Sequence, residues 1–190
     1  MPAPYRILGY AVVSADGMIA DSTGLMPNEL IFDADKEFFE HELDLVDAVV
    51  QGRNSYEYHA NSPKRRRLVL TRKVDTLAPD PNFANGFLWN PDGAPFPEAC
   101  RALGLAEGTI AVLGGPHVYD LFLRIGFDAF YLCRAENVTV PGGVQVFPEV
   151  GSGRSPEDVL AQFGLAPGPV QTLDGANALT LVAWAPRAGA

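Results

Sequence analysis

Short apolar runs that alternate with segments of helical periodicity most restrict the fold of this chain. The apolar runs last four to seven residues each and stop at turn-forming residues; they cover residues 7–13, 47–51, 67–71, 87–90, 109–113 and 129–133. Helical spacing of apolar residues separates several of these runs, at residues 34–45, 96–103 and 117–125. Because buried strands that alternate with helices form parallel sheets, the order predicts an α/β fold with a mainly parallel central sheet flanked by helices.

The end of the chain follows a different pattern. Two strand-like runs, residues 170–173 and 179–184, flank the turn-forming segment Asp174-Gly175-Ala176-Asn177. This arrangement predicts an antiparallel C-terminal hairpin at an edge of the sheet. A weaker strand is expected at residues 144–147 and a short helix at residues 156–163. The length of 190 residues fits a single domain, residues 1–190.

The charge balance restricts the partners of the chain. The sequence has 14 Lys and Arg against 23 Asp and Glu, a formal net charge of -9. Nucleic acids and anionic membranes are bound by clustered Lys and Arg, so we expect no nucleic-acid and no membrane partner. No apolar run approaches the ~20 residues of a membrane span, and no secretory signal is recognisable. We therefore expect a cytoplasmic protein.

The cysteines and histidines indicate neither disulfides nor a metal site. Cys100 and Cys133 are too few for a disulfide framework in a chain of this length. We expect reduced thiols, with Cys133 as a small buried core residue. His41, His59 and His117 show no metal-ligand spacing with the cysteines, so no metal is expected.

The first motif that suggests chemistry is the pair Gly114-Gly115. It stands between a predicted strand and the predicted helix at residues 117–125, with Pro116 suited to the first helical turn. Glycines let a ligand approach the backbone closely, and a helix N-terminus attracts anions. A tight strand-to-helix turn without a ligand explains the same residues, so alone the motif is weak evidence for phosphate binding.

A second motif, Gly52-Arg53-Asn54-Ser55, follows another predicted strand. The planar guanidinium of Arg53 suits a phosphate, and Asn54 and Ser55 can donate to phosphate oxygens. The alternative is a capped helix start beside a solvated arginine.

The third motif, Thr71-Arg72-Lys73, places a hydroxyl and two cations at a strand end. This combination suits the 2′-phosphate of an adenosine ribose and would favour NADP over NAD, although a solvated strand end is the commoner use of such charges. The preceding run Lys64-Arg65-Arg66-Arg67 is interpreted as a solvated loop. A single carboxylate, Asp35, lies near the start of the first predicted helix, where Asp33 can act as the cap. By itself Asp35 is an ordinary partner of the helix dipole.

Taken in order, the motifs resemble those of the dihydrofolate reductase-like family over residues 5–150. The matching residues are Asp16-Gly17-Met18-Ile19-Ala20, Met26-Pro27, Asp35 with Phe38-Phe39, Gly52-Arg53-Asn54-Ser55-Tyr56-Glu57, Leu70-Thr71-Arg72, Leu113-Gly114-Gly115-Pro116-His117-Val118-Tyr119, Tyr131-Leu132 and Phe147-Pro148. Residues 14–21 and 47–53 are closer to the reductase branch of riboflavin biosynthesis, known as the C-terminal domain of bifunctional deaminase-reductases, than to folate enzymes. The resemblance implies a dihydrofolate reductase-like fold.

The resemblance also implies an NADPH-dependent oxidoreductase. It would transfer a hydride to a small-molecule heterocycle, pyrimidine- or pterin-like, as 5-amino-6-(5-phosphoribosylamino)uracil reductase does. The implied cofactor-binding residues are Val12, Ile19, Gly52, Arg53, Asn54, Ser55, Thr71, Arg72, Leu113, Gly114, Gly115, His117, Val118 and Tyr119. The implied substrate-binding residues are Tyr10, Asp35, Phe39 and Leu113, with Asp35 as the catalytic group. Relatives in the riboflavin branch are commonly dimers, which implies a homodimer.

Two positions depart from the folate enzymes. Asn28 follows Pro27 where those enzymes usually carry a tryptophan, and Cys133 stands in place of a substrate-side threonine. Arg65 falls near the place where folate enzymes hold a substrate carboxylate. Two alternatives therefore remain: a true dihydrofolate reductase, and a non-catalytic nucleotide-binding accessory protein. Turnover of dihydrofolate would favour the first, and NADPH binding without turnover of any heterocycle would favour the second.

Overall fold

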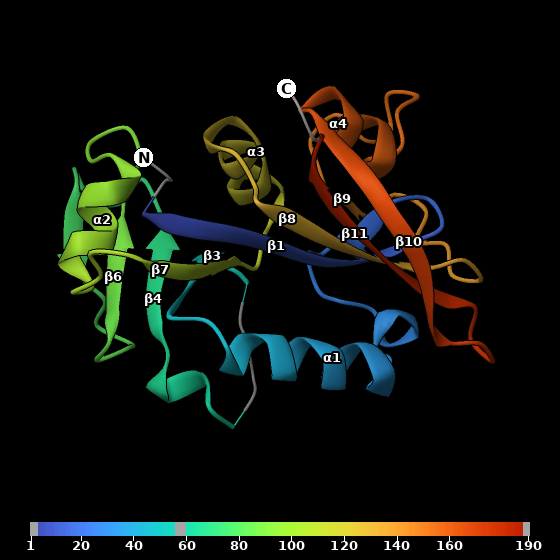
Figure 1. Cartoon of the computed structure of the whole chain (residues 1–190), viewed down its shortest axis with the longest axis horizontal. Helices are drawn as coiled ribbons and strands as arrows, with labels where there is room; N and C mark the ends of the chain where they lie inside the picture. The colour runs from blue at the N-terminus through green and yellow to red at the C-terminus, as the bar shows by residue number, and fades with distance from the viewer. Residues whose placement is uncertain (1–3, 56–59, 188–190) are drawn as a thin grey trace.

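A nine-stranded sheet crosses the molecule from end to end (Figure 1). The computed structural model describes residues 4–55 and 60–187. The strand order is β10-β11-β8-β1-β7-β3-β4-β6-β5. The strands are β1 (Tyr5–Ser14), β3 (Ala48–Gly52), β4 (Arg66–Leu70), β5 (Leu77–Pro79), β6 (Gly86–Trp89), β7 (Gly108–Val112), β8 (Ala129–Ala135), β10 (Leu165–Asp174) and β11 (Leu179–Pro186).

The centre of this sheet is parallel and its ends are antiparallel. β1 pairs in parallel with β7 and β8, β3 with β4 and β7, and β4 with β6. The pairs β10–β11, β11–β8 and β5–β6 are antiparallel. A separate two-stranded sheet joins β2 (Met18–Ala20) to β9 (Val144–Gln145). The predicted parallel sheet with an antiparallel C-terminal hairpin is therefore confirmed.

Helices cover both faces of the sheet. α1 (Asp33–Asp44) lies along one face, and α2 (Phe96–Ala102), α3 (Pro116–Ile125) and α4 (Pro156–Gln162) contribute to the core on the other (Figure 1). Two 3-10 turns, η1 (Asn28–Leu30) and η2 (Ser62–Lys64), complete the described elements. Within residues 4–55 and 60–187, no helix combines the length and apolar character needed to cross a bilayer.

The burial of β1 explains why the strands appear in the sequence as continuous apolar runs rather than as alternating apolar and polar residues. Tyr5, Ile7 and Val13 enter the cluster beneath α2, α3 and α4, whereas Leu8 and Tyr10 belong to the cluster beneath α1. Both faces of this strand are thus buried, as is usual for a central parallel strand covered by helices on both sides.

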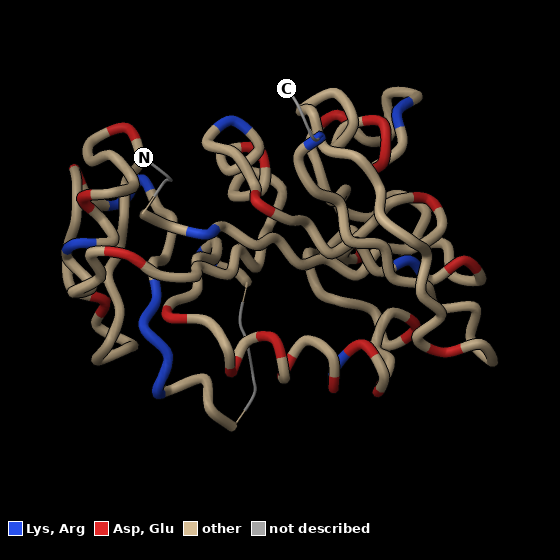
Figure 2. Tube along the Cα trace, viewed as in Figure 1, with Lys and Arg blue, Asp and Glu red and all other residues tan. Residues whose placement is uncertain are grey.

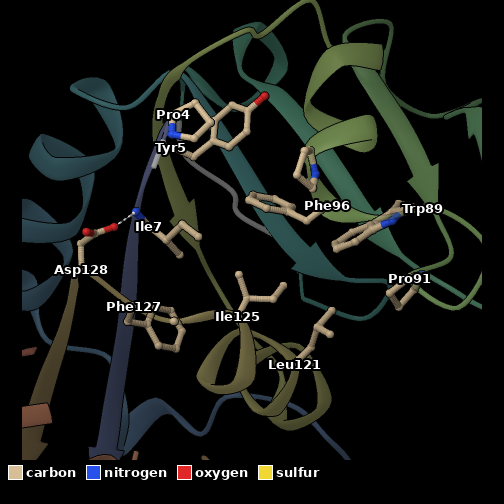
Figure 3. Close-up of a pocket in the computed structure, with 12 residues that line it drawn as sticks. Pro4, Tyr5, Ile7, Trp89, Pro91, Phe96, Leu121, Ile125, Phe127 and Asp128 are labelled. Atoms are coloured by element: carbon tan, nitrogen blue, oxygen red, sulfur yellow. Dashed lines mark hydrogen bonds between the residues drawn. The ribbon is translucent and has the colours of Figure 1, made fainter. Parts of the chain in front are cut away.

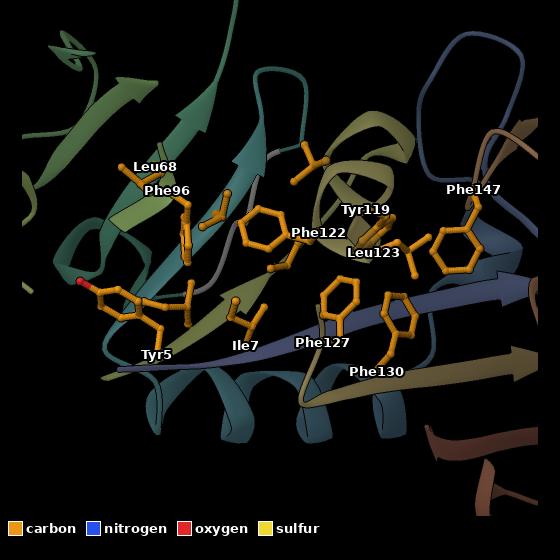
Figure 4. Close-up of a cluster of buried hydrophobic side chains, with 14 of the residues drawn as sticks. Tyr5, Ile7, Leu68, Phe96, Tyr119, Phe122, Leu123, Phe127, Phe130 and Phe147 are labelled. Carbon is orange, nitrogen blue, oxygen red and sulfur yellow. The ribbon is translucent and has the colours of Figure 1, made fainter. Parts of the chain in front are cut away.

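The larger core is rich in aromatic rings (Figure 4). Phe122 of α3 is fully buried and packs edge-to-face on Phe96, with ring centroids 5.1 Å apart at an interplanar angle of 86°. Phe127 packs in the same way on Phe130, at 5.2 Å and 84°. Such contacts add to the apolar burial that holds α2 and α3 on the sheet.

Three expectations from the sequence are corrected. β2 and β5 were not predicted, because three residues are too few to show a period. Asp33 does not cap α1: the N-cap is Phe32, and Asp33 is the first helical residue. The basic run at residues 64–67 is not a solvated loop throughout, since it runs from η2 into β4.

Arg67 shows the physical reason for the last correction. Because side chains alternate along a strand, Arg66 points to solvent while Arg67 is fully buried. The guanidinium of Arg67 donates to the Ser62 hydroxyl at 2.9 Å and lies 4.0 Å from the centre of the Phe83 ring. Arg67 therefore fixes η2 against the sheet.

We predict that Phe122→Ala will destabilise the protein much more than Ile125→Ala on the same helix. Phe122 is completely buried, so its removal leaves a cavity and should cost about 3–5 kcal/mol. Ile125 is 42% exposed, and its truncation should cost about 1 kcal/mol or less. Urea unfolding followed by circular dichroism measures both. Equal losses would contradict the assignment of the core.

Candidate active site

Two glycine-containing turns interlock at the carboxyl ends of β3 and β7. The Gly52 amide donates to the Gly114 carbonyl at 2.7 Å, and the Gly115 amide donates to the Ser55 hydroxyl at 3.1 Å. The parallel register pairs Val50 with Val112, so both strands end at the same level. The structure therefore joins the two motifs, which are separated by about sixty residues in the sequence, into one surface.

Gly114 is required for this geometry. Its φ of +89° lies in the region that favours glycine, and a Cβ there would come within 2.5 Å of the Tyr119 ring. The buried Tyr119 in turn donates its hydroxyl to the Tyr10 carbonyl of β1. The turn is thus held against both neighbouring strands, β3 and β1.

Among the described residues, a Cβ at Gly115 would meet only the Ser55 hydroxyl, at 3.9 Å. Gly115 is the N-cap of α3, a helix of ten residues that begins at Pro116. His117, in the first turn, is exposed, whereas Val118 is buried behind it. Backbone approach at a helix N-terminus is the arrangement expected of an anion site.

The cationic residues of the other motifs lie along the same edge. Gly52 pairs with Leu70 in the register of β3 and β4, so Thr71 and Arg72 follow directly beside Arg53. Both arginines are exposed. The Thr71 hydroxyl accepts a hydrogen bond from the Lys73 amide at 3.2 Å, which shapes the turn after β4.

Asp35 lies on the buried side of α1, close to Cys133 of the sheet and Tyr119 of α3. It accepts a hydrogen bond from the Cys133 thiol of β8 and acts electrostatically on Tyr119. Burial raises the pKa of Asp35, and the hydrogen bond from Cys133 offsets this only in part. The pKa of Cys133 is also raised, by its own burial and by the neighbouring carboxylate. Asp35 is therefore a carboxyl group that retains its proton more readily than usual.

Aromatic residues fill the space between β1 and α1 beside Asp35. The Tyr10 ring stacks on Tyr131 with centroids 5.0 Å apart at 9°, and Phe39 meets it edge-on at 5.8 Å. The Tyr10 hydroxyl donates to the Glu42 carboxylate at 2.9 Å. Tyr10 is only 4% exposed, so it supports this wall mainly from beneath.

Three apolar residues of the predicted site line its remaining borders. Val12 pairs with Cys133 across β1 and β8. Ile19 of β2 packs against the core cluster that contains Val118 and Tyr119. Leu113 is partly exposed, and its amide donates to the Val50 carbonyl at 2.8 Å. The predicted residues thus lie on β1, β2, α1, the turns after β3, β4 and β7 and the start of α3, and their grouping into one site remains a prediction.

Arg65 is engaged elsewhere. Its guanidinium pairs with Asp44 at 2.5 Å and donates to the Leu43 carbonyl at 3.2 Å. The Arg65 side chain is only 8% exposed, and it joins the end of α1 to the start of β4. Tyr56 and Glu57, which belonged to the motif after β3, lie outside the described residues.

A cavity lies away from these residues (Figure 3). It has a volume of about 590 Å³ and is formed by the start of β1, the end of β6, α2 and α3. Tyr5, Trp89 and Phe96 line it, and no residue of the predicted site does. Among the described residues no group of three or more His, Cys, Asp or Glu could hold a metal ion.

The role of three residues was not predicted from the sequence. These residues, Ser14, Arg134 and Glu157, organise the turn between β1 and β2. Arg134 and Glu157 are separated by 23 residues, and no local pattern pairs them.

No family model and no curated protein matches the sequence. Solved structures do match. A pyrimidine reductase-like protein from Corynebacterium diphtheriae superposes with a TM-score of 0.64 at 14% identity, over 95% of this chain and 91% of that one. Dihydrofolate reductase from Enterococcus faecalis, complexed with NADP(H) and RAB-propyl, gives 0.60 at 17% identity over 95% of both chains.

A two-activity protein from Thermotoga maritima matches equally well. This diaminohydroxyphosphoribosylaminopyrimidine deaminase/5-amino-6-(5-phosphoribosylamino)uracil reductase gives a TM-score of 0.63 at 17% identity. The match covers 97% of this chain but 57% of that protein, so this chain spans little more than half of its length. Together the comparisons confirm the predicted dihydrofolate reductase-like fold.

We predict that Gly114→Ala will destabilise the protein more than Gly104→Ala. Both glycines have positive φ, +89° and +75°, so both substitutions incur backbone strain of about 1–2 kcal/mol. Only at Gly114 would the new methyl group also collide with the Tyr119 ring, since nothing lies within 4 Å of a Cβ at Gly104. Urea unfolding of the two variants measures the difference. Equal losses would show that the turn can relax away from Tyr119.

Proposed function

We propose that this chain is an NADPH-dependent reductase that transfers a hydride to a pyrimidine- or pterin-like heterocycle. The observation that carries the proposal is the position of the interlocked turns at Gly52 and Gly114 beside a partly buried carboxyl group, Asp35. The names of the structural neighbours support it: one is a uracil reductase, one is pyrimidine reductase-like, and one is a dihydrofolate reductase complexed with NADP(H).

The residues present fit this cofactor. Gly115 and the start of α3 suit a pyrophosphate. Arg53 and Arg72, both exposed on the same edge, supply the positive charge that a 2′-phosphate requires. Ile19 and Leu113, which are partly exposed, offer apolar contacts to a flat ring, whereas Val12 and Val118 are buried. The bound cofactor supplies the hydride, which is chemistry that the side chains cannot provide.

Asp35 would hold a proton for the substrate. Its pKa is raised by burial, so its carboxyl oxygen can donate a hydrogen bond to a ring nitrogen and then release the proton to it. Cys133 orients the carboxyl group from β8. Phe39 provides partly exposed aromatic surface beside it for a planar ring, and the buried Tyr10 supports this wall from beneath.

Two alternatives remain as outcomes of experiment. A true dihydrofolate reductase would turn over dihydrofolate more efficiently than simple pyrimidines or pterins. A non-catalytic nucleotide-binding protein would bind NADPH and reduce no heterocycle. A substrate screen with dihydrofolate, dihydropterins and aminouracil ribosides therefore separates the three functions.

We predict that the protein binds NADPH more tightly than NADH, and that Arg72→Gln removes most of the difference. The loss of a charged hydrogen bond to the 2′-phosphate should weaken NADPH binding by about 10- to 100-fold and leave NADH binding nearly unchanged. Fluorescence titration measures both. Arg101→Gln, at an exposed position of α2, is the matched control and should change neither. Equal binding of both nucleotides by the wild type would refute the cofactor assignment.

We predict that Asp35→Asn lowers turnover by ~100-fold or more, because an amide cannot release the proton. Asp33→Asn, two residues earlier on the exposed side of α1, is the control and should leave turnover unchanged. In the wild type, turnover should fall as the pH rises through the raised pKa of Asp35. This limb of the pH profile should be absent from the residual activity of Asp35→Asn.

The same substitution should have a pH-dependent effect on stability. The folded-state pKa of Asp35 is raised above its unfolded value. The contribution of Asp35 to the free energy of unfolding is therefore fully present below the unfolded pKa and is lost as the pH rises through the folded pKa. Asp35→Asn should therefore gain stability relative to the wild type as the pH rises through that range. Urea midpoints at acidic and alkaline pH measure this, and a constant difference would show that Asp35 is not buried as described.

A further inference from the structure

The turn between β1 and β2 is held by an unusual number of polar contacts. The Ser14 hydroxyl is fully buried, donates to the Asp16 carboxylate at 2.5 Å and accepts from the Met18 amide at 2.9 Å. The Asp16 carboxylate also accepts from the Val140 amide at 3.0 Å. Burial acts to raise the pKa of Asp16, but these hydrogen bonds outweigh it and lower the pKa. The turn therefore contains a partly buried carboxylate whose charged form these hydrogen bonds favour.

Arg134 of β8 binds the same turn from the side. Its Nη1 donates to the Ala15 carbonyl at 2.9 Å and contacts the Ser14 carbonyl at 3.5 Å. Its Nε donates to Glu157 of α4 at 3.0 Å, and its Nη2 makes a second, shorter bond to the same oxygen. One guanidinium thus joins α4 to the backbone of the β1–β2 turn.

α4 also packs directly on this turn. A Cβ at Gly17 would lie 2.8 Å from Val150 and 3.1 Å from Pro156, the first residue of α4. The Gly17 carbonyl accepts from the Val146 amide at 3.1 Å, next to the pairing of β2 with β9. Contact on both sides leaves little room for the turn to shift while α4 stays in place.

The ion pair between Arg134 and Glu157 loses more hydration than an ion pair on the surface does. Only 15% of the Arg134 side chain and 34% of the Glu157 side chain are exposed. Removing these charges from water is unfavourable, and such pairs can serve to fix one conformation rather than to add stability. What this pair fixes is the turn that leads directly into Ile19, and Ile19 packs on the cluster that contains Val118 and Tyr119.

We propose that Arg134, oriented by Glu157, is a positioning residue that holds the β1–β2 turn so that β2 stays against the cofactor side of the site. The inference rests on the proposed function, because it assigns Ile19 to the border of the hydride-transfer site. Arg134 is not among the predicted cofactor- and substrate-binding residues, and it acts through the Ser14 and Ala15 carbonyls. α4, which otherwise lies outside the site, thereby becomes part of its support.

The test compares Arg134→Gln with Arg124→Gln. Arg124 pairs with Asp120 at 2.9 Å on the exposed face of α3 and is the matched control. In the protein without ligands, hydrogen exchange at the amides of residues 15–20 should be about 10- to 100-fold faster in Arg134→Gln. Exchange in β3 and β7 should be unchanged, and Arg124→Gln should match the wild type throughout.

Kinetics provide the second measurement. With NADPH and the best heterocycle of the substrate screen, Arg134→Gln should lower kcat by about 10- to 100-fold through misplacement of the reacting groups. The dissociation constant for NADPH should change little, since the phosphate contacts lie elsewhere. Arg134→Lys should be intermediate and guards against a variant that fails to fold. The effects of Arg134→Gln and Glu157→Gln on kcat should not add in the double variant, because both residues act through one contact.

Unchanged exchange at residues 15–20 in Arg134→Gln would overturn the proposal, because the turn would then be held without Arg134. Faster exchange with unchanged kcat would overturn it as well, because the position of the turn would not matter for the reaction. Wild-type protein that binds NADPH but reduces no heterocycle would instead refute the proposed function, and with it this inference.

Discussion

The parallel pairing of β7 with β1 on one side and β3 on the other is the constraint on which the site depends. It places the carboxyl ends of β3 and β7 at one level, so that Gly52 can donate to the Gly114 carbonyl. It also places Tyr10 within reach of the Tyr119 hydroxyl. Ligands of parallel α/β sheets bind outside the carboxyl ends of the strands, where the chain order reverses. β1 has β7 and β8 as neighbours and lies at such a point.

Burial determines which protonation state of Asp35 is favoured. Asp35 would be an ordinary acid on a solvated helix, but α1 turns it toward Cys133 and Tyr119, where its charged form is poorly solvated. The same burial that raises the pKa of this carboxyl group lowers the stability of the fold as the pH rises through that pKa. The core on the opposite face of the sheet offsets this loss of stability. Aromatic rings of α2 and α3 pack there, and one of them, Phe122, is completely buried.

Periodicity predicted the larger elements because long apolar runs and helices repeat a signal over many residues. The strands β1, β3, β7 and β8, the helix α1 and the C-terminal hairpin fall within a few residues of their predicted positions. Elements of three residues could not be predicted in this way. Arg67 was misjudged for a different reason: a run of like charges suggests solvent, whereas strand alternation buries every second side chain. The site residues came from ordered motifs, and contacts between distant positions, such as Arg134 with Glu157, left no local trace.

Rigidity around the β1–β2 turn follows from the way the chain closes the sheet. β1 is buried on both faces, but its continuation into β2 leaves the sheet and can pair only with the two residues of β9. So short a pairing gives little stability by itself. Additional contacts must therefore come from outside the ladder, and they come from the Ser14 hydroxyl, from Asp16 and from the guanidinium of Arg134. Because Arg134 is itself oriented by α4, the short helix before the C-terminal hairpin determines how precisely β2 is placed beside the start of α3.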